Sequence, residues 1–241
     1  MKTVMIENEK GEYEKMSALV EIQDISKIYN PGENEVRALD HVSLSIQQNE
    51  FVAIIGQSGS GKSTLMNMLG CLDLPTSGTY MLNGQDVSKM TDDEQSDIRN
   101  KEIGFIFQGF NLIPNLTALE NVELPLIYRG VSKQVRSELA KNALEKVGLA
   151  NRMTHKPAEM SGGQQQRVAI ARAIAQAPPI ILADEPTGNL DSNSSKEIMG
   201  ILRGLHKEGR TVILITHDNE IANEAERIIK IKDGKIESDS R

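Results

Sequence analysis

Apolar and polar positions alternate over much of the chain, and their spacing predicts strands and helices. Residues 19–29 alternate in the way that is typical of a half-buried strand, and residues 36–46 return as a second strand after a turn at 30–34. Residues 51–55 are apolar and mostly β-branched without a break, which indicates a buried strand. An antiparallel sheet is therefore expected ahead of a buried strand.

The middle of the chain, about residues 89–160, is mainly helical in pattern, whereas both flanks alternate strands with helices. Residues 92–100 and 132–147 have helical patterns. Residues 117–120, Thr-Ala-Leu-Glu, form a capping-box pattern that opens another helix. This asymmetry favours an α/β fold with a helical subdomain inserted into a βαβ core.

A glycine-rich segment directly follows the buried strand. Residues 56–64 read Gly-Gln-Ser-Gly-Ser-Gly-Lys-Ser-Thr and fit the phosphate-binding pattern Gly-x-x-x-x-Gly-Lys-Ser/Thr, with a helical pattern after it. Glycines let successive N–H groups converge on phosphate oxygens, while Lys62 would neutralise the β- and γ-phosphates and Ser63 would bind Mg²⁺. An ordinary Gly/Ser turn is the alternative, which the flanking strand and helix disfavour. The predicted binding positions are Gly56, Gln57, Ser58, Gly59, Ser60, Gly61, Lys62, Ser63 and Thr64.

A second capping pattern, Ser-Gly-Gly-Gln at residues 161–164, opens a helical pattern that runs to Gln176. Two glycines at a helix start are costly, because each loses more entropy on folding than alanine. They are explained if a ligand approaches the bare backbone, and a helix N-terminus suits a phosphate group. The alternative is a capped helix without a ligand. The predicted contacts are Ser161, Gly162, Gly163 and Gln164.

Charged and polar side chains follow two further apolar strands, at 179–183 and 211–216. Asp184 and Glu185 end the first, where ligands bind in parallel α/β sheets, and His217 ends the second. Asp184 suits an outer-sphere Mg²⁺ contact, Glu185 suits orientation of a water, and a neutral His217 suits contact with a γ-phosphate. The alternative is a pair of solvated acids and a structural histidine.

Composition narrows the class of protein. The 241 residues carry a formal charge of −7, which argues against a general nucleic-acid binder, and the single Cys71 excludes an internal disulfide. No apolar run reaches the length of a membrane span. Residues 1–17 are rich in charge, so we expect a flexible N-terminal extension before one domain at 18–241.

Tyr29, at the end of the first strand, is equally compatible with a surface aromatic and with a base-stacking platform.

Taken in order, these motifs resemble those of an ABC-transporter ATPase subunit. Residues 56–63 are similar to the Walker A loop, Gln108 to the Q-loop, 161–165 to the signature, 180–184 with Glu185 to Walker B and the catalytic glutamate, Asp191 to the D-loop and His217 to the H-loop. Met160 departs from the leucine that usually opens the signature. The resemblance implies a P-loop NTPase (RecA-like) core with an antiparallel β subdomain and an inserted α-helical subdomain at about 89–160.

The same resemblance implies roles for single residues. ATP and Mg²⁺ would be the cofactors, and it favours adenine stacking for Tyr29 and a nucleotide contact for Asp191. The implied catalytic residues are Lys62, Gln108, Glu185 and His217, and the implied metal contacts are Ser63, Gln108 and Asp184. Two copies would assemble head to tail, each signature capping the γ-phosphate held by the other copy.

Residues 104–114, 119–125 and 183–191 resemble more narrowly the macrolide-exporter and lipoprotein-release class. This implies efflux or extraction through an integral-membrane permease, with or without a periplasmic or extracellular adaptor, at the cytoplasmic face of the membrane. Since the sequence ends at Arg241, we expect the permease on another chain. The apolar positions after Gln108 are interpreted either as core or as a groove for the permease: Phe110, Leu112, Ile113, Pro114 and Leu116.

Other functions known within that family are the alternatives. A DNA-repair or chromosome-maintenance ATPase would carry a long coiled-coil or zinc insertion, and a translation factor would carry two such domains; the sequence has neither. A regulatory ATPase that signals through its permease without transport, as a cell-division ATPase related to the macrolide-exporter class does, stays open.

Overall fold

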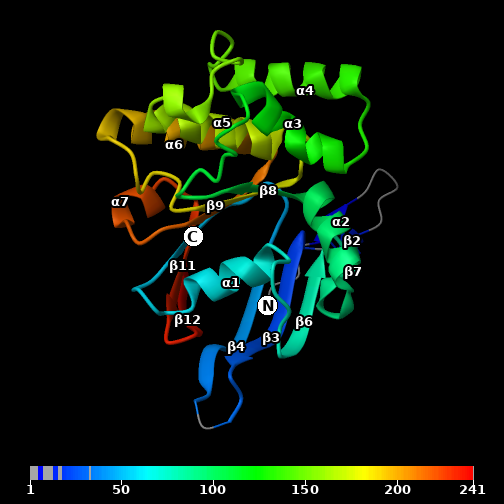
Figure 1. The fold of residues 1–241 in the computed structure, drawn as a ribbon. Coiled ribbons are helices and arrows are strands. Elements are labelled where there is room, and N and C mark those ends of the chain that lie inside the picture. The colour runs from blue at the N-terminus through cyan, green and yellow to red at the C-terminus, as the bar shows by residue number, and fades with distance from the viewer. Residues whose placement is uncertain (1–4, 8–12, 16–17, 33, 241) are drawn as a thin grey trace.

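The computed structural model describes residues 5–7, 13–15, 18–32 and 34–240, and two sheets organise most of them (Figure 1). The larger sheet has six strands: Phe51–Ile55 (β5), Ile103–Ile106 (β8), Ile180–Asp184 (β9), Thr211–Ile215 (β10), Arg227–Lys232 (β11) and Lys235–Ser240 (β12). Their order is β12-β11-β5-β10-β9-β8, and all neighbours are parallel except β12, which pairs antiparallel with β11.

The second sheet is the predicted antiparallel one. Val20–Tyr29 (β3), Val36–Ile46 (β4), Ser77–Leu82 (β6) and Gln85–Asp86 (β7) lie in the order β4-β3-β6-β7. Met5–Glu7 (β1) and Tyr13–Lys15 (β2) form a separate antiparallel pair. They fall in the expected N-terminal extension, and the rest of residues 1–17 lies outside the described residues.

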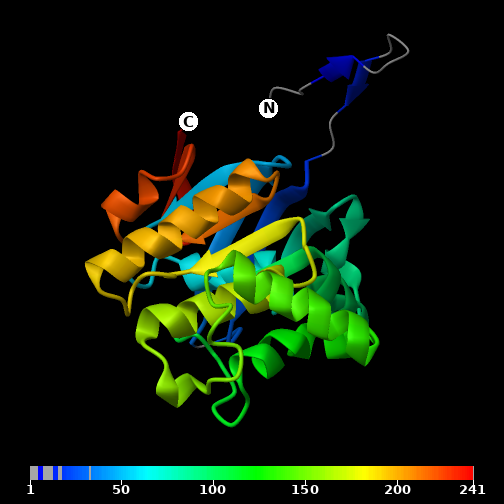
Figure 2. The ribbon, with the colours of Figure 1, turned by 90° about the horizontal axis from the view of Figure 1, so that it is seen from above.

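Helices cover both faces of the larger sheet. They are Lys62–Leu69 (α1), Asp92–Glu102 (α2), Ala118–Tyr128 (α3), Lys133–Lys146 (α4), Gly162–Ile174 (α5), Ser192–Lys207 (α6) and Asn219–Ala222 (α7), with 3₁₀ turns at Val87–Lys89 and Pro157–Glu159. The two predicted capping boxes, at Thr117 and Ser161, are present. In Figure 1, α3, α4 and α5 gather on one side of the sheet and α1 lies on the other; the view from above shows α6 beside them (Figure 2).

Two hydrophobic cores meet at the larger sheet, because its central strands send alternate side chains to opposite faces. In β5, Val52 and Ile54 belong to the core formed with α1 and the antiparallel sheet. Phe51 and Ala53 belong to the core formed with α3 to α6. Burial on both faces explains why β5, β9 and β10 have continuous apolar sequences.

The stretch expected as the helical subdomain also contains β8, which pairs with β9 at the edge of the larger sheet. From there the chain passes to α3 and α4 and returns through α5. Among the described residues, no helix combines the length and the apolar character that crossing a bilayer requires.

Candidate functional site

One cavity of about 920 Å³ opens beyond the carboxyl ends of β5, β9 and β10. In parallel α/β sheets this edge is where ligands bind. The cavity brings together twelve of the predicted site residues: Gly56, Gln57, Ser58, Gly59, Gly61, Lys62, Ser63, Thr64, Gln108, Asp184, Glu185 and His217. The elements that carry them are far apart in sequence, so the sheet topology assembles the site.

The glycine-rich loop curls tightly between β5 and α1. Gly61 has a φ of 102°, and a Cβ there would lie 2.5 Å from the carbonyl oxygen of Ala38, so the position admits only glycine. Lys62 begins α1, and its Nζ donates hydrogen bonds to the carbonyls of Gly56 (2.7 Å) and Gln57 (2.8 Å). The ammonium group is thereby held over the loop, beside the N-terminus of α1, where an anion is favoured.

The C-terminal hairpin, formed by β11 and β12, contacts this loop through the turn at Gly234. The N–H of Gly234 donates to the carbonyl of Ser60 (2.9 Å), and the Gly234 carbonyl accepts from the N–H of Asp40 (2.9 Å). A Cβ on Gly56 would lie 2.4 Å from the carbonyl oxygen of Ile231. Ser60 is buried and is not among the residues that line the cavity.

Glu185 is held by three donors at the end of β10. Its Oε1 accepts from the N–H (2.9 Å) and Nδ1 (2.6 Å) of His217, and its Oε2 accepts from Oγ1 of Thr216 (3.0 Å). An ionised carboxylate only accepts, so Nδ1 carries the proton and Nε2 remains available to a ligand. Glu185 has a φ of 43°, a conformation that non-glycine residues seldom adopt and that occurs preferentially at functional sites.

Asp184 lies beside it in an environment that disfavours its charge. Burial, and then repulsion by Glu185, raise the pKa of Asp184 above its ordinary value, although Lys62 acts in the opposite direction. Two adjacent carboxylates near the Ser63 hydroxyl fit a hard cation that prefers oxygen ligands. Within the described residues no three His, Cys, Asp or Glu side chains gather closely enough to hold a metal by themselves. Oxygen donors of this kind suit Mg²⁺, which usually completes its coordination with water and substrate phosphate.

Other predicted site residues lie outside this cavity. Residues 161–164 begin α5, where Ser161 accepts from the N–H of Gln164 (3.3 Å). Asp191 caps α6 by accepting from the N–H groups of Asn193 and Ser194 (both 3.0 Å). The Tyr29 hydroxyl donates to Asp73 Oδ2 (2.9 Å), so this aromatic is held by the segment after α1.

Gln108 connects the residues that line the cavity with the predicted site residues that lie outside it. It lines the cavity, its Nε2 donates to Asn189 Oδ1 (3.4 Å), and its carbonyl accepts from Asn189 Nδ2 (3.1 Å). Asn189 belongs to the turn that leads to Asp191. The cavity is thus linked to the capped end of α6 through one pair of amide side chains.

Sequence reasoning missed several residues that line the cavity. Those with side chains that could contact a ligand are Val36, Arg37, Asn219 and Lys230. Lys230 reaches the site because β11 pairs with β5, and no local sequence signal reports such a pairing. Val36 and Arg37 stand at the start of β4, where the alternating pattern predicted a strand but gave no sign of a binding role.

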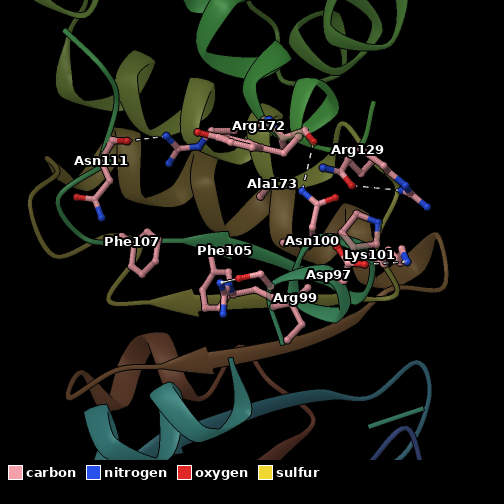
Figure 3. Close-up of a pocket in the computed structure, with 17 residues that line it drawn as sticks. Asp97, Arg99, Asn100, Lys101, Phe105, Phe107, Asn111, Arg129, Arg172 and Ala173 are labelled. Atoms are coloured by element: carbon pink, nitrogen blue, oxygen red, sulfur yellow. Dashed lines mark hydrogen bonds and ion pairs between the residues drawn. The ribbon is translucent and has the colours of Figure 1, made fainter. Parts of the chain in front are cut away.

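A second cavity, of about 830 Å³, lies between α2, β8 and the carboxyl ends of α3 and α5 (Figure 3). Four of its lining residues are basic and one is acidic: Arg99, Lys101, Arg129, Arg172 and Asp97. Phe105, Phe107 and Tyr128 add aromatic surface. The apolar residues expected to form a groove do not line it, although Asn111 in the same loop does.

Comparisons with known proteins show what this chain is similar to. Residues 39–188 match a family model described as "ABC transporter". The macrolide export ATP-binding/permease protein MacB of Hyphomonas neptunium is 55% identical over 92% of this chain, which covers only 34% of that relative. The uncharacterized ABC transporter ATP-binding protein YvrO of Bacillus subtilis is 54% identical over 92% of this chain and 97% of its own length.

Solved structures support the same relationship. A dimeric post-hydrolysis structure of the ATP-binding cassette MJ0796, bound to ADP and phosphate, superposes with a TM-score of 0.85 at 48% identity, and covers 92% of this chain and 98% of that one. This likeness confirms the expected α/β fold, with its P-loop core, antiparallel sheet and inserted helices.

Proposed function

This chain belongs to the ABC transporter family of ATP-binding, ATP-hydrolysing proteins, and from that membership we propose that it powers a transporter of the macrolide-exporter and lipoprotein-release type. Residues 18–241 would be the ABC ATPase domain, with the helical subdomain at about 89–160. The observation that carries the proposal is the cavity in which Lys62, Gln108, Glu185 and His217 meet. The similarity to the macrolide export ATP-binding/permease protein MacB supports the narrower class.

The predicted site residues in that cavity have roles in hydrolysis that follow from their positions. The loop at 56–64 and Lys62 bind the phosphates, since backbone N–H groups and a cation converge there. Ser63, Gln108 and Asp184 would hold Mg²⁺, which would supply charge neutralisation when bound. Glu185 orients the attacking water, and His217, with Nδ1 on Glu185, contacts the γ-phosphate through Nε2. Positioning and electrostatics account for most of such catalysis.

A second copy of the chain completes the site. The residues at 161–164 do not line the cavity of their own chain, and Gly162 has no neighbour within 3.4 Å of where a Cβ would stand. We infer that Ser161, Gly162, Gly163, Gln164 and Asp191 meet the nucleotide bound by the partner, in a head-to-tail dimer. Tyr29 stacks on the adenine of its own chain. The dimeric ADP-bound and phosphate-bound MJ0796 supports this arrangement.

The permease is the second partner, and it places the chain at the cytoplasmic face of the membrane. MacB relatives carry an ATP-binding and a permease function in one protein, and this chain spans about a third of their length. We propose the basic cavity of Figure 3 as the docking place, because its lining is positive in a chain of charge −7. A permease segment with carboxylate side chains would match it, and Arg129→Glu should weaken co-purification with the permease.

The decisive test is Glu185→Gln. The amide keeps the shape but cannot orient water as a carboxylate does, so ATP should hold two copies together while turnover falls by about 10²-fold or more. Dimer formation is measured by light scattering with ATP, and turnover by phosphate release. Glu138→Gln, an exposed position on α4, is the matched control and should behave as wild type. Brisk phosphate release from Glu185→Gln would refute the assigned role, and a monomer at saturating ATP would refute the dimer.

A further inference from the structure

Gln108 is presented by a tight turn whose two ends are held by one helix. The N–H of Phe110 donates to the carbonyl of Phe107 (3.2 Å), which closes a turn with Gln108 and Gly109 at its centre. The side chain of Gln108 faces the nucleotide cavity. Its position there depends on whatever fixes the carbonyls of Phe107 and Phe110.

Gln166 on α5 fixes the first end. Its side chain is fully buried, and Nε2 donates to the carbonyls of Phe107 (3.3 Å) and Pro186 (2.7 Å). Pro186 directly follows Glu185, so one amide joins the segment before Gln108 to the segment after the catalytic acid. A buried donor with two acceptors is costly to displace.

Arg172, near the carboxyl end of α5, fixes the second end. Its Nη2 donates to the carbonyl of Phe110 (2.9 Å). Its Nη1 donates to the carbonyl of Asn111 (2.5 Å), and Figure 3 shows this second bond. Burial lowers the pKa of Arg172, and no carboxylate within the described ranges forms an ion pair with it. The charge of its guanidinium is therefore directed at these two carbonyls.

The backbone at this end of the turn adopts a conformation that is uncommon for one of its residues. Phe110 has a φ of 62°, in the left-handed region that a bulky side chain seldom occupies, and Asn111, a residue type found there more often, has a φ of 52°. The following part of the loop is anchored separately, because buried Asn121 bonds the N–H and carbonyl of Ile113. Arg172 therefore stabilises this end of the turn through both carbonyls, in addition to the bond from the N–H of Asn111 to the carbonyl of Gly109 (2.6 Å).

We propose that Gln166 and Arg172 are positioning residues that tie Gln108 to α5, the helix whose first turn carries residues 161–164. Arg172 also lines the basic cavity, so one side chain contacts both that cavity and the turn that presents Gln108. This inference rests on the proposed function, in which Gln108 contacts Mg²⁺ and the attacking water.

A double-mutant cycle of ATP hydrolysis tests it. Arg172→Gln should lower kcat about 10- to 100-fold, the range typical of a misplaced catalytic group, and leave the KM for ATP within about 3-fold. Gln108→Ala should cause a similar loss. Because Arg172 acts through Gln108, the double variant should be no slower than Gln108→Ala alone. If Arg172→Gln prevents folding, Arg172→Lys takes its place in the cycle, because a single ammonium group does not reproduce the forked geometry of the guanidinium.

Arg210 offers a matched control. Its Nη1 donates to the carbonyls of Ala177 (2.7 Å) and Pro178 (3.0 Å), and Ala177 also has a positive φ of 54°, but this contact is remote from Gln108. Arg210→Gln should lower the unfolding temperature and keep kcat. The inference is overturned if Arg172→Gln keeps wild-type kcat, or if its loss adds to that of Gln108→Ala. Absence of hydrolysis in the wild type would instead refute the proposed function.

Discussion

Gly162→Ala separates a structural from a functional need for glycine at the start of α5. A Cβ at Gly162 would find Leu190 Cδ2 at 3.5 Å and Phe110 Cζ at 3.7 Å, which are ordinary van der Waals distances. At Gly163 the same atom would lie 2.6 Å from Oγ and 2.9 Å from Cβ of Ser194 on α6. The fold therefore requires glycine at 163, because α5 and α6 approach closely there, but not at 162.

The expected magnitudes follow from these contacts. Gly162→Ala lies within α5, so it should stabilise the chain by about 0.4–1 kcal/mol through the unfolded state. For a chain of this size that is a rise of about 1–4 °C in Tm. Gly163→Ala adds a clash, which typically costs about 1–3 kcal/mol and outweighs the helical gain. If the partner's γ-phosphate meets Gly162, a methyl group there should lower kcat about 10- to 100-fold.

Thermal unfolding without nucleotide and steady-state phosphate release together measure both effects. The expected result is that Gly162→Ala is at least as stable as wild type, hydrolyses ATP slowly and dimerises weakly when combined with Glu185→Gln. Wild-type hydrolysis and dimerisation by a stable Gly162→Ala protein would refute the reasoning, since no ligand would then approach that backbone.

Three further predictions concern single side chains. Asp184→Asn should abolish hydrolysis and raise Tm at pH 7. The rise in Tm is expected because the pKa of Asp184 is raised in the folded state, which therefore loses stability as pH rises through that pKa. The gain in Tm should shrink as pH falls toward 4, and an unchanged Tm at pH 7 would contradict this. Asn121→Ala should cost about 2–4 kcal/mol in urea unfolding, because the buried side chain satisfies backbone groups of Ile113, Leu116 and Thr117; a loss below about 1 kcal/mol would contradict the anchoring role. Tyr29→Ala should weaken ATP binding about 5-fold or more in a fluorescent-nucleotide titration, whereas Tyr29→Phe keeps the ring; equal loss in both would assign the effect to the Asp73 hydrogen bond.

Sequence patterns correctly predicted the features that depend on residues close together in the chain. Phe51–Ile55 is apolar because both of its faces are buried, and that run identified β5 correctly. The capping boxes at Thr117 and Ser161 satisfy N–H groups within three residues, so helix starts could be placed from sequence alone. Asp184 and Glu185 fell at the expected edge because a parallel sheet brings strand ends together.

Contacts between segments that are far apart in the sequence could not be predicted from such local patterns. Ser60 fits the phosphate-loop pattern, yet its side chain is buried and its carbonyl bonds the hairpin tip, which is contributed by residues far along the chain. Lys230 enters the cavity through the pairing of β11 with β5. The basic cavity combines α2 with the ends of α3 and α5, so neither its charge nor its place could be read from one segment. The roles of the individual site residues stay predictions until the variants are measured.

The bracing of the phosphate loop by the C-terminal hairpin has a consequence for biosynthesis. β5 pairs with β10 and β11, so when residues 51–55 leave the ribosome neither neighbour has been translated. Gly234, which supports the Ser60 carbonyl, comes later still. The nascent chain therefore holds an unpaired, strongly apolar strand for most of translation and depends on chaperones or on early burial by α1 to avoid aggregation. ATP stabilises only the folded domain that can bind it, so it does not stabilise the nascent chain.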